Sequence, residues 1–280
     1  MKQDLLITMH RHLQGLVDFV HLRPLAQITF RRLTSGRYKE GRLARARQNG
    51  RVWMLDLSVA LRGEEQEPET IEWLRRVLVS GATAIDVGAN VGQMTLEMAA
   101  LVGKGGTVVA IEPGPGNVRC LRRHIAGNAM EDRVRVIEAA CMDIDGGEVV
   151  LRTFTGSGNP GEVASGHAVL GRESHEGTKR TDVAVSRVSI DGVAQRLNLI
   201  PAAIKIDVEG SELAVLAGAK KTLSVYKPAL RVAFHPFAFD SPLEASEQLR
   251  QLLREAGYYI QSDPGSALSL DEYVAVPTSA

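Results

Sequence analysis

Cysteine is scarce in this sequence. Cys120 and Cys141 are the two cysteines among 280 residues, too few to build a disulfide framework. Neither has another cysteine or a histidine nearby at a spacing that suggests a metal site. We therefore expect two buried thiols, no metal beside them, and a protein of a reducing compartment, the cytoplasm.

Long apolar runs and aromatic residues are also missing. No stretch of about 18 apolar residues occurs, so we expect no transmembrane segment. The first 15 residues contain Asp4 and lack both an apolar core and a small-residue cleavage site, so we expect no secretory signal peptide. Aromatic residues make up 5% of the chain, which leaves few rings for stacking on bases, so we expect no nucleic-acid partner.

The chain has no formal net charge, because 33 basic residues balance 33 acidic ones. The charges are unevenly placed: residues 1–51 hold eleven Lys and Arg against three Asp and Glu, a net charge of +8. A basic arm on an acidic body suggests an anionic or carrier-bound substrate or a membrane surface, although a solvated arm fits equally well. Apolar residues at helical spacing over residues 5–20 predict an amphipathic helix, for which we favour a role as a lid or a homodimer contact.

From residue 70 onward, short apolar runs alternate with segments of helical character. This alternation predicts an α/β domain, doubly wound around a mostly parallel sheet, that follows an N-terminal helical extension of residues 1–69. The last two predicted strands, at 258–261 and 272–276, flank a hairpin-type turn, which predicts an antiparallel terminal strand. Two strands with period-2 patterning enclose a Gly- and Ser-rich loop, so we expect an inserted hairpin and loop at about 148–190.

One of the predicted strands contains an acid and runs into a glycine turn, Asp86-Val-Gly88-Ala-Asn90-Val-Gly92. Gly88 permits a positive φ and close approach of a ligand, and Gly92 permits close packing of the next helix. A dinucleotide-binding turn has glycine where Asn90 stands, and Asp86 would repel a phosphate. Asp86 suits a ligand ammonium instead, so the turn favours a ligand with an amino-acid end.

The next predicted strand ends in Glu112 and Pro113. An acid at the tip of the second strand is typical of sites that hold a ribose, because a carboxylate accepts hydrogen bonds from both hydroxyl groups. An amino-acid end and a ribose end together describe S-adenosylmethionine.

Three segments resemble the FkbM family of methyltransferases: Asp86 to Gly92, Glu112-Pro-Gly-Pro115 and Ile204-Lys-Ile-Asp-Val-Glu-Gly-Ser-Glu212. The resemblance implies a class I methyltransferase fold, Rossmann-like and seven-stranded. It also implies S-adenosylmethionine as the methyl donor and O-methylation of a hydroxyl on a natural product or sugar. The residues that it places around the donor are Asp86, Gly88, Asn90 and Gly92 at the methionine end, Glu112 and Pro113 at the ribose, and Ala140 to Asp143 near the adenine.

The segment around Asp207 is unusual for a central strand, because Lys205, Asp207 and Glu209 alternate along one face of it. Unpaired burial of three charges is very costly, so we expect them to face one another, a ligand or a polar cleft. Asp207 and Glu209 are candidates for the acceptor side of the site, with Lys205 holding one of them. Glu209 and Glu212 could instead favour the N-terminus of the following helix.

His235 follows the next predicted strand, at the same edge of the sheet. Removal of a hydroxyl proton needs a base, and histidine has a suitable pKa near neutral pH. Two carboxylates and a histidine also suit a divalent metal, and we favour the base role over a metal held by Asp207 and Glu209. A structural histidine before a proline is the alternative.

Two other functions share parts of this pattern. A nicotinamide-dependent oxidoreductase has the same strand, glycine turn and acidic tip, but Asn90 and Asp86 count against it. A non-catalytic binding protein could use the same fold as a platform, and the retained acids Asp86, Glu112 and Asp207 count against that.

Overall fold

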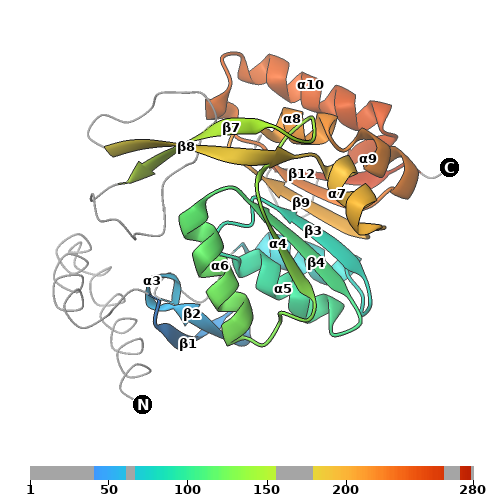
Figure 1. Cartoon of the computed structure of the whole chain (residues 1–280). Coiled ribbons are helices and arrows are strands. Elements are labelled where there is room, and N and C mark those ends of the chain that lie inside the picture. Colours follow the sequence, from blue (N-terminus) through green and yellow to red (C-terminus); the bar gives the residue numbers. More distant parts are fainter. Residues whose placement is uncertain (1–40, 61–66, 156–178, 262–271, 279–280) are drawn as a thin grey trace, which may run out of the picture.

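The computed structural model describes residues 41–60, 67–155, 179–261 and 272–278. Its main sheet has seven strands in the order β11-β12-β10-β9-β3-β4-β5 (Figure 1). The strands are β3 (Thr83–Val87), β4 (Thr107–Glu112), β5 (Val134–Glu138), β9 (Ala203–Asp207), β10 (Ala229–Ala233), β11 (Tyr258–Gln261) and β12 (Glu272–Pro277). β12 is antiparallel to both of its neighbours. This is the doubly wound, mostly parallel sheet that the sequence predicts, with its antiparallel terminal strand.

Helices cover both faces of the sheet. One face carries α4 (Pro68–Val77), α5 (Gln93–Val102) and α6 (Pro115–Gly127), and the other carries α7 (Ile190–Leu197), α8 (Glu212–Ala217), α9 (Lys220–Tyr226) and α10 (Pro242–Glu255). Successive strand residues point to opposite faces: Ala84 packs with the first group of helices, and Ile85 packs with the second. The prediction of an α/β fold with helices on both faces is confirmed.

The helices are short, and several begin at a proline. Pro68, Pro115 and Pro242 occupy the first turns of α4, α6 and α10, where the missing N–H costs no helical hydrogen bond. α10 is the longest helix that the structure describes, with 14 residues. No helix within the described ranges combines the length and the apolar character that crossing a bilayer requires.

A β-hairpin precedes the main domain and packs on it. β1 (Leu43–Gln48) and β2 (Arg51–Asp56) are antiparallel and contact α6, and α3 (Leu57–Ala60) follows them and packs on the hairpin (Figure 1). Trp53 and Leu55 belong to the same apolar cluster as α4, α5 and α6. The amphipathic helix predicted over residues 5–20 lies outside the described residues.

The insertion predicted at about 148–190 forms a separate three-stranded sheet. β7 (Glu148–Thr155) and β8 (Lys179–Val188) are antiparallel, and β6 (Ala140–Cys141) pairs with β8. Figure 1 shows this hairpin extending past the main sheet. The Gly- and Ser-rich loop between β7 and β8 lies outside the described residues.

Candidate active site

Close contacts on both sides determine where glycine is needed in the turn after β3. Gly88 has φ +79° and lies so close to the end of β9 that a Cβ atom would collide with the carbonyl oxygen of Asp207. Gly92 has φ +91°, and a Cβ atom there would collide with Leu121 on α6. Both positions favour glycine, because side chains avoid this backbone region, and at Gly88 the backbone of β9 also leaves no space for a side chain. The turn places β3, β9 and the N-terminus of α5 against one another.

Asp86 lies beneath this turn and is completely buried. Its Oδ2 accepts a hydrogen bond from Thr95 Oγ1 at 2.5 Å, whereas Oδ1 is buried without a hydrogen-bond partner. Burial raises the pKa of this carboxyl, and the charge of Lys205 and the Thr95 hydrogen bond oppose that rise only in part. A buried acceptor without a partner is costly, so a ligand donor at Oδ1 would remove a penalty.

Glu112, at the tip of β4, is held by hydrogen bonds from three donors. Oε2 accepts from the backbone N–H of Asn90 at 2.9 Å, while Oε1 accepts from the Gly114 N–H at 2.8 Å and from Asn117 Nδ2 at 3.1 Å. Burial raises the pKa of Glu112, and these hydrogen bonds counteract it. A carboxylate offers about four acceptor positions. The bound Glu112 therefore keeps about one acceptor position for a ligand hydroxyl.

Lys205 and Asp207 form an ion pair on β9. Lys205 Nζ is 2.9 Å from Asp207 Oδ2, and Lys205 is buried. Burial alone would lower the pKa of Lys205, but the neighbouring carboxylates of Asp207, Glu67 and Asp86 raise it well above its usual range. Burial likewise favours the neutral form of Asp207, and the adjacent lysine reverses this and lowers the pKa. The expectation that charged residues of this strand face one another is confirmed for Lys205 and Asp207, which pair directly.

His235 lies between two carboxylates at the end of β10. Its Nδ1 is 2.6 Å from Oε1 of Glu212, and its Nε2 is 3.6 Å from Oδ1 of Asp207. Glu212 is completely buried, and its Oε1 also accepts from the N–H of Gly210. The sequence pattern predicts Glu212 only as an acid at the N-terminus of a helix. The structure gives it a second role, as the partner of His235.

A cavity of about 260 Å³ lies at this edge of the sheet. Most of the predicted site residues line it: Asp86, Gly88, Asn90, Gly92, Glu112, Pro113, Ala140, Lys205, Asp207 and Glu209. His235 and Asp143 are not among its lining residues. Glu67, Asn117 and Leu151 line the cavity without having been predicted. Leu151 comes from the inserted hairpin, which therefore forms part of the cavity wall.

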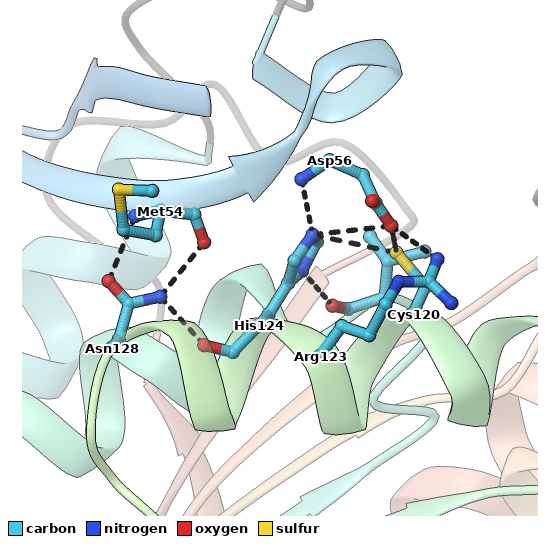
Figure 2. Close-up of polar contacts among 7 residues, drawn as sticks. Met54, Asp56, Cys120, Arg123, His124 and Asn128 are labelled. Carbon is cyan, nitrogen blue, oxygen red and sulfur yellow. Dashed lines mark hydrogen bonds and ion pairs between the residues drawn. The ribbon is translucent and has the colours of Figure 1, made fainter. Parts of the chain in front are cut away.

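A second polar cluster lies outside the cavity, where the N-terminal hairpin meets α6 (Figure 2). Cys120 Sγ is 2.7 Å from Asp56 Oδ2 and 3.5 Å from His124 Nε2. The expectation that neither cysteine has a histidine at metal-ligand spacing was wrong, because residues four apart on a helix share a face. Among the described residues, these three form the group whose ligand atoms lie close enough for a metal, and Asp207 and Glu209 belong to no such group.

Hydrogen bonds already occupy the atoms of this second cluster. The backbone N–H of Asp56 donates to His124 Nε2 at 2.8 Å, and His124 Nδ1–H donates to the Val91 carbonyl at 2.7 Å. Arg123 Nη2 donates to Asp56 Oδ2 at 2.6 Å, which places a positive charge beside the carboxylate (Figure 2). A metal would have to displace the hydrogen bond at Nε2 and lie next to the guanidinium. The cluster instead connects the hairpin to the glycine turn, because Val91 lies within that turn.

Comparison with known proteins gives a family match and several weaker similarities. Residues 86–260 match the model of the methyltransferase FkbM domain. A 72-residue stretch is 39% identical to protein-L-isoaspartate O-methyltransferase from Caenorhabditis elegans, and it covers 24% of this chain and 32% of that protein.

Among solved structures, methyltransferase FkbM from Methylobacillus flagellatus is 18% identical, with a TM-score of 0.46. The aligned part covers 79% of this chain and 52% of that one. A SAM-dependent O-methyltransferase from Thermotoga maritima is 12% identical, with a TM-score of 0.43, and the alignment covers 91% and 82% of the two chains. The match thus spans about a third of the curated relative and about half of the first of these structures.

Proposed function

We propose that this chain, which belongs to the FkbM family of methyltransferases, transfers a methyl group from S-adenosylmethionine to a hydroxyl group of a small molecule. A natural product or a sugar is the acceptor class that the family resemblance favours. The observation that carries the proposal is an imidazole held by a buried carboxylate at the same edge of the sheet as the cavity.

The residues around the cavity fit S-adenosylmethionine. The unpartnered Oδ1 of Asp86 suits the ammonium of an amino-acid end. Gly88 has no side chain to block a ligand from the turn, and Glu112 keeps an acceptor position for a ribose hydroxyl. When bound, the sulfonium supplies a methyl group that an oxygen nucleophile can take in a single displacement.

In this proposal, His235 takes the proton of the acceptor hydroxyl. Glu212 accepts a hydrogen bond from Nδ1, so Nε2 is the ring nitrogen left to receive a proton. The carboxylates of Asp207 and Glu212 stabilise the imidazolium that forms, and Lys205 fixes the position of Asp207. The remaining contribution is orientation, because holding the oxygen in line with the methyl group lowers the entropic cost of reaction.

The same proposal covers the acceptor's charge, the compartment and the role of the N-terminal segment. The acceptor is anionic or bound to an acidic carrier, because residues 1–51 carry a net charge of +8. The chain works in the cytoplasm. The N-terminal segment, whose residues up to 40 lie outside the described ranges, serves as a lid or as a homodimer contact.

The test uses the full chain and S-adenosylmethionine labelled in the methyl group. Transfer is measured to a panel of sugars, polyols, phenols and hydroxy acids, with and without a phosphate group, and mass spectrometry locates the methyl group. An isoaspartyl peptide serves as a carboxylate acceptor, and amines serve as nitrogen acceptors. We expect label on a hydroxyl oxygen, and transfer solely to carboxylates or amines would refute O-methylation of a hydroxyl.

Two variants test the assigned roles. His235→Gln and Asp207→Asn should retain binding of S-adenosylhomocysteine, measured by calorimetry, and should lose transfer by at least about 100-fold. Full transfer in both variants would refute the base assignment. Absence of any binding of S-adenosylmethionine to the unaltered chain, together with NADH fluorescence enhancement, would favour the oxidoreductase instead.

A further inference from the structure

Glu67 occupies an unusual position immediately before α4. It has φ +45° and ψ +60°, in the left-handed region that side chains avoid, and Pro68 follows it. The residue before a proline favours extended conformations. The positive φ and the following proline therefore both disfavour this backbone conformation. Such strain concentrates at functional sites. Glu67 also stands at the N-cap position of α4 and makes no side-chain capping hydrogen bond.

The Glu67 carboxylate turns to the cavity and not to its own helix. Glu67 lines the cavity, and its Oε2 is 3.9 Å from Nζ of Lys205. That distance is too long for a hydrogen bond, and the ammonium of Lys205 already bonds Asp207 at 2.9 Å. Glu67 is therefore a secondary partner of Lys205, with a half-exposed side chain that can turn to a ligand.

Carboxylates outnumber cations along the cavity wall. Lys205 is its single lysine, and the described lining contains no arginine, whereas the acidic lining residues are Glu67, Asp86, Glu112, Asp207 and Glu209. Glu112 already accepts from three donors and keeps its remaining acceptor position for the ribose, and Asp207 is paired with Lys205. Asp86, with its unpartnered Oδ1, and Glu67, whose nearest approach to Lys205 is 3.9 Å, both keep an acceptor for a ligand cation.

We infer that Glu67 and Asp86 together bind the α-ammonium group of the methyl donor. Asp86 contributes from the floor of the cavity, on β3, and Glu67 contributes from its wall, at the start of α4. The inference rests on the proposed use of S-adenosylmethionine. Glu67 lies before the part of the chain that matches the family model, residues 86–260. The segment before that domain thus supplies part of the donor site.

The test compares three ligands on the full chain by calorimetry. S-adenosylmethionine and S-adenosylhomocysteine both carry the α-ammonium, whereas 5′-methylthioadenosine lacks the amino-acid end. Glu67→Gln should weaken the first two by about tenfold, the scale of one charge-assisted hydrogen bond, and should leave the affinity for 5′-methylthioadenosine unchanged. Glu67→Asp, which keeps the charge, should recover part of the loss.

The matched control is Glu69→Gln. Glu69 carries the same charge two residues further along, its Oε2 is 3.8 Å from Arg231 Nη2, and it does not line the cavity. We expect Glu69→Gln to bind all three ligands as the unaltered chain does. If the two Gln variants weakened binding equally, the inference would be overturned, because the effect of Glu67 would then come only from the net charge of the chain.

Four other results separate the possible failures. A loss for 5′-methylthioadenosine as large as for S-adenosylmethionine would give Glu67 a structural role. A loss for S-adenosylmethionine alone would mean that Glu67 recognises the sulfonium. Unchanged affinity for all three ligands would overturn the assignment and leave the methyltransferase proposal standing, whereas an unaltered chain that binds none of them would remove both.

Discussion

Nδ1 of His235 lies 2.6 Å from Oε1 of Glu212, whose side chain is completely buried. A carboxylate accepts and does not donate, so the hydrogen of the imidazole lies on Nδ1. The N–H of Gly210 donates to the same oxygen at 3.0 Å and fixes the carboxylate in turn. Glu212 therefore acts as a positioning residue that sets the tautomer and the direction of the imidazole.

Replacing Glu212 by Gln should slow methyl transfer without weakening donor binding. An amide holds the imidazole by a weaker hydrogen bond and removes the charge that stabilises the imidazolium, so we expect kcat to fall about 10–100-fold. Glu212 does not line the cavity, so the Kd of S-adenosylhomocysteine should stay the same. Rates are measured with an acceptor from the panel, and Glu244→Gln on α10 is the control. A parallel loss of donor affinity would contradict the positioning role.

The pKa of His235 should lie above 6.5. Burial alone would lower it, but the hydrogen bond and charge of Glu212, with the charges of Asp207 and Glu209, raise it overall. The neutral imidazole is the base, so transfer should increase as the pH rises through this raised pKa. Nuclear magnetic resonance of the ring carbons measures the titration without an acceptor, and the signal lost in His235→Gln identifies the residue. Glu212→Gln should move the midpoint to lower pH, and a midpoint at or below 6.5 in the unaltered chain would contradict the prediction.

Gly88→Ala should cost more stability than left-handed backbone strain alone. Gly88 and Gly50 share φ +79°, but a Cβ atom at Gly50 meets nothing within 4 Å, whereas at Gly88 it collides with the Asp207 carbonyl. We expect Gly50→Ala to lower the free energy of unfolding by about 1 kcal/mol. Gly88→Ala should lower it by about 2–4 kcal/mol and weaken donor binding. Urea unfolding measures both, and equal values would show that β3 and β9 can separate without cost.

The sequence predicts the sheet because strand and helix periods differ and because apolar strand residues must be buried on both faces. Ile85 and Ile204 illustrate this, since both are completely buried. The predicted acids at Asp86 and Glu112 lie where the register of parallel strands puts them, at one edge of the sheet. These positions can be predicted from the sequence, because they depend only on the spacing of residues along each strand.

Side-chain partners across the fold were less predictable. Glu67 falls within the predicted N-terminal extension of residues 1–69, and its cavity position depends on how the start of α4 approaches Lys205 of β9. Glu212 is compatible with a simple helix N-terminus, and its bond to His235 depends on how β10 ends. The i, i+4 spacing of Cys120 and His124 was a visible signal, but the sequence does not show that Asp56 reaches them.

His124→Ala should destabilise the chain strongly although the residue lies outside the cavity. The imidazole is completely buried and joins the Asp56 N–H of the hairpin to the Val91 carbonyl of the glycine turn. Alanine would leave a cavity and two buried backbone groups without partners, so we expect a loss of about 3–5 kcal/mol in urea unfolding. Arg122→Ala, which removes an exposed ion pair from the same helix, should cost less than about 0.5 kcal/mol. Donor affinity should also fall in His124→Ala under conditions where the chain stays folded, because Val91 loses its hydrogen bond. A loss comparable to that of Arg122→Ala would show that the hairpin contributes little to holding the turn.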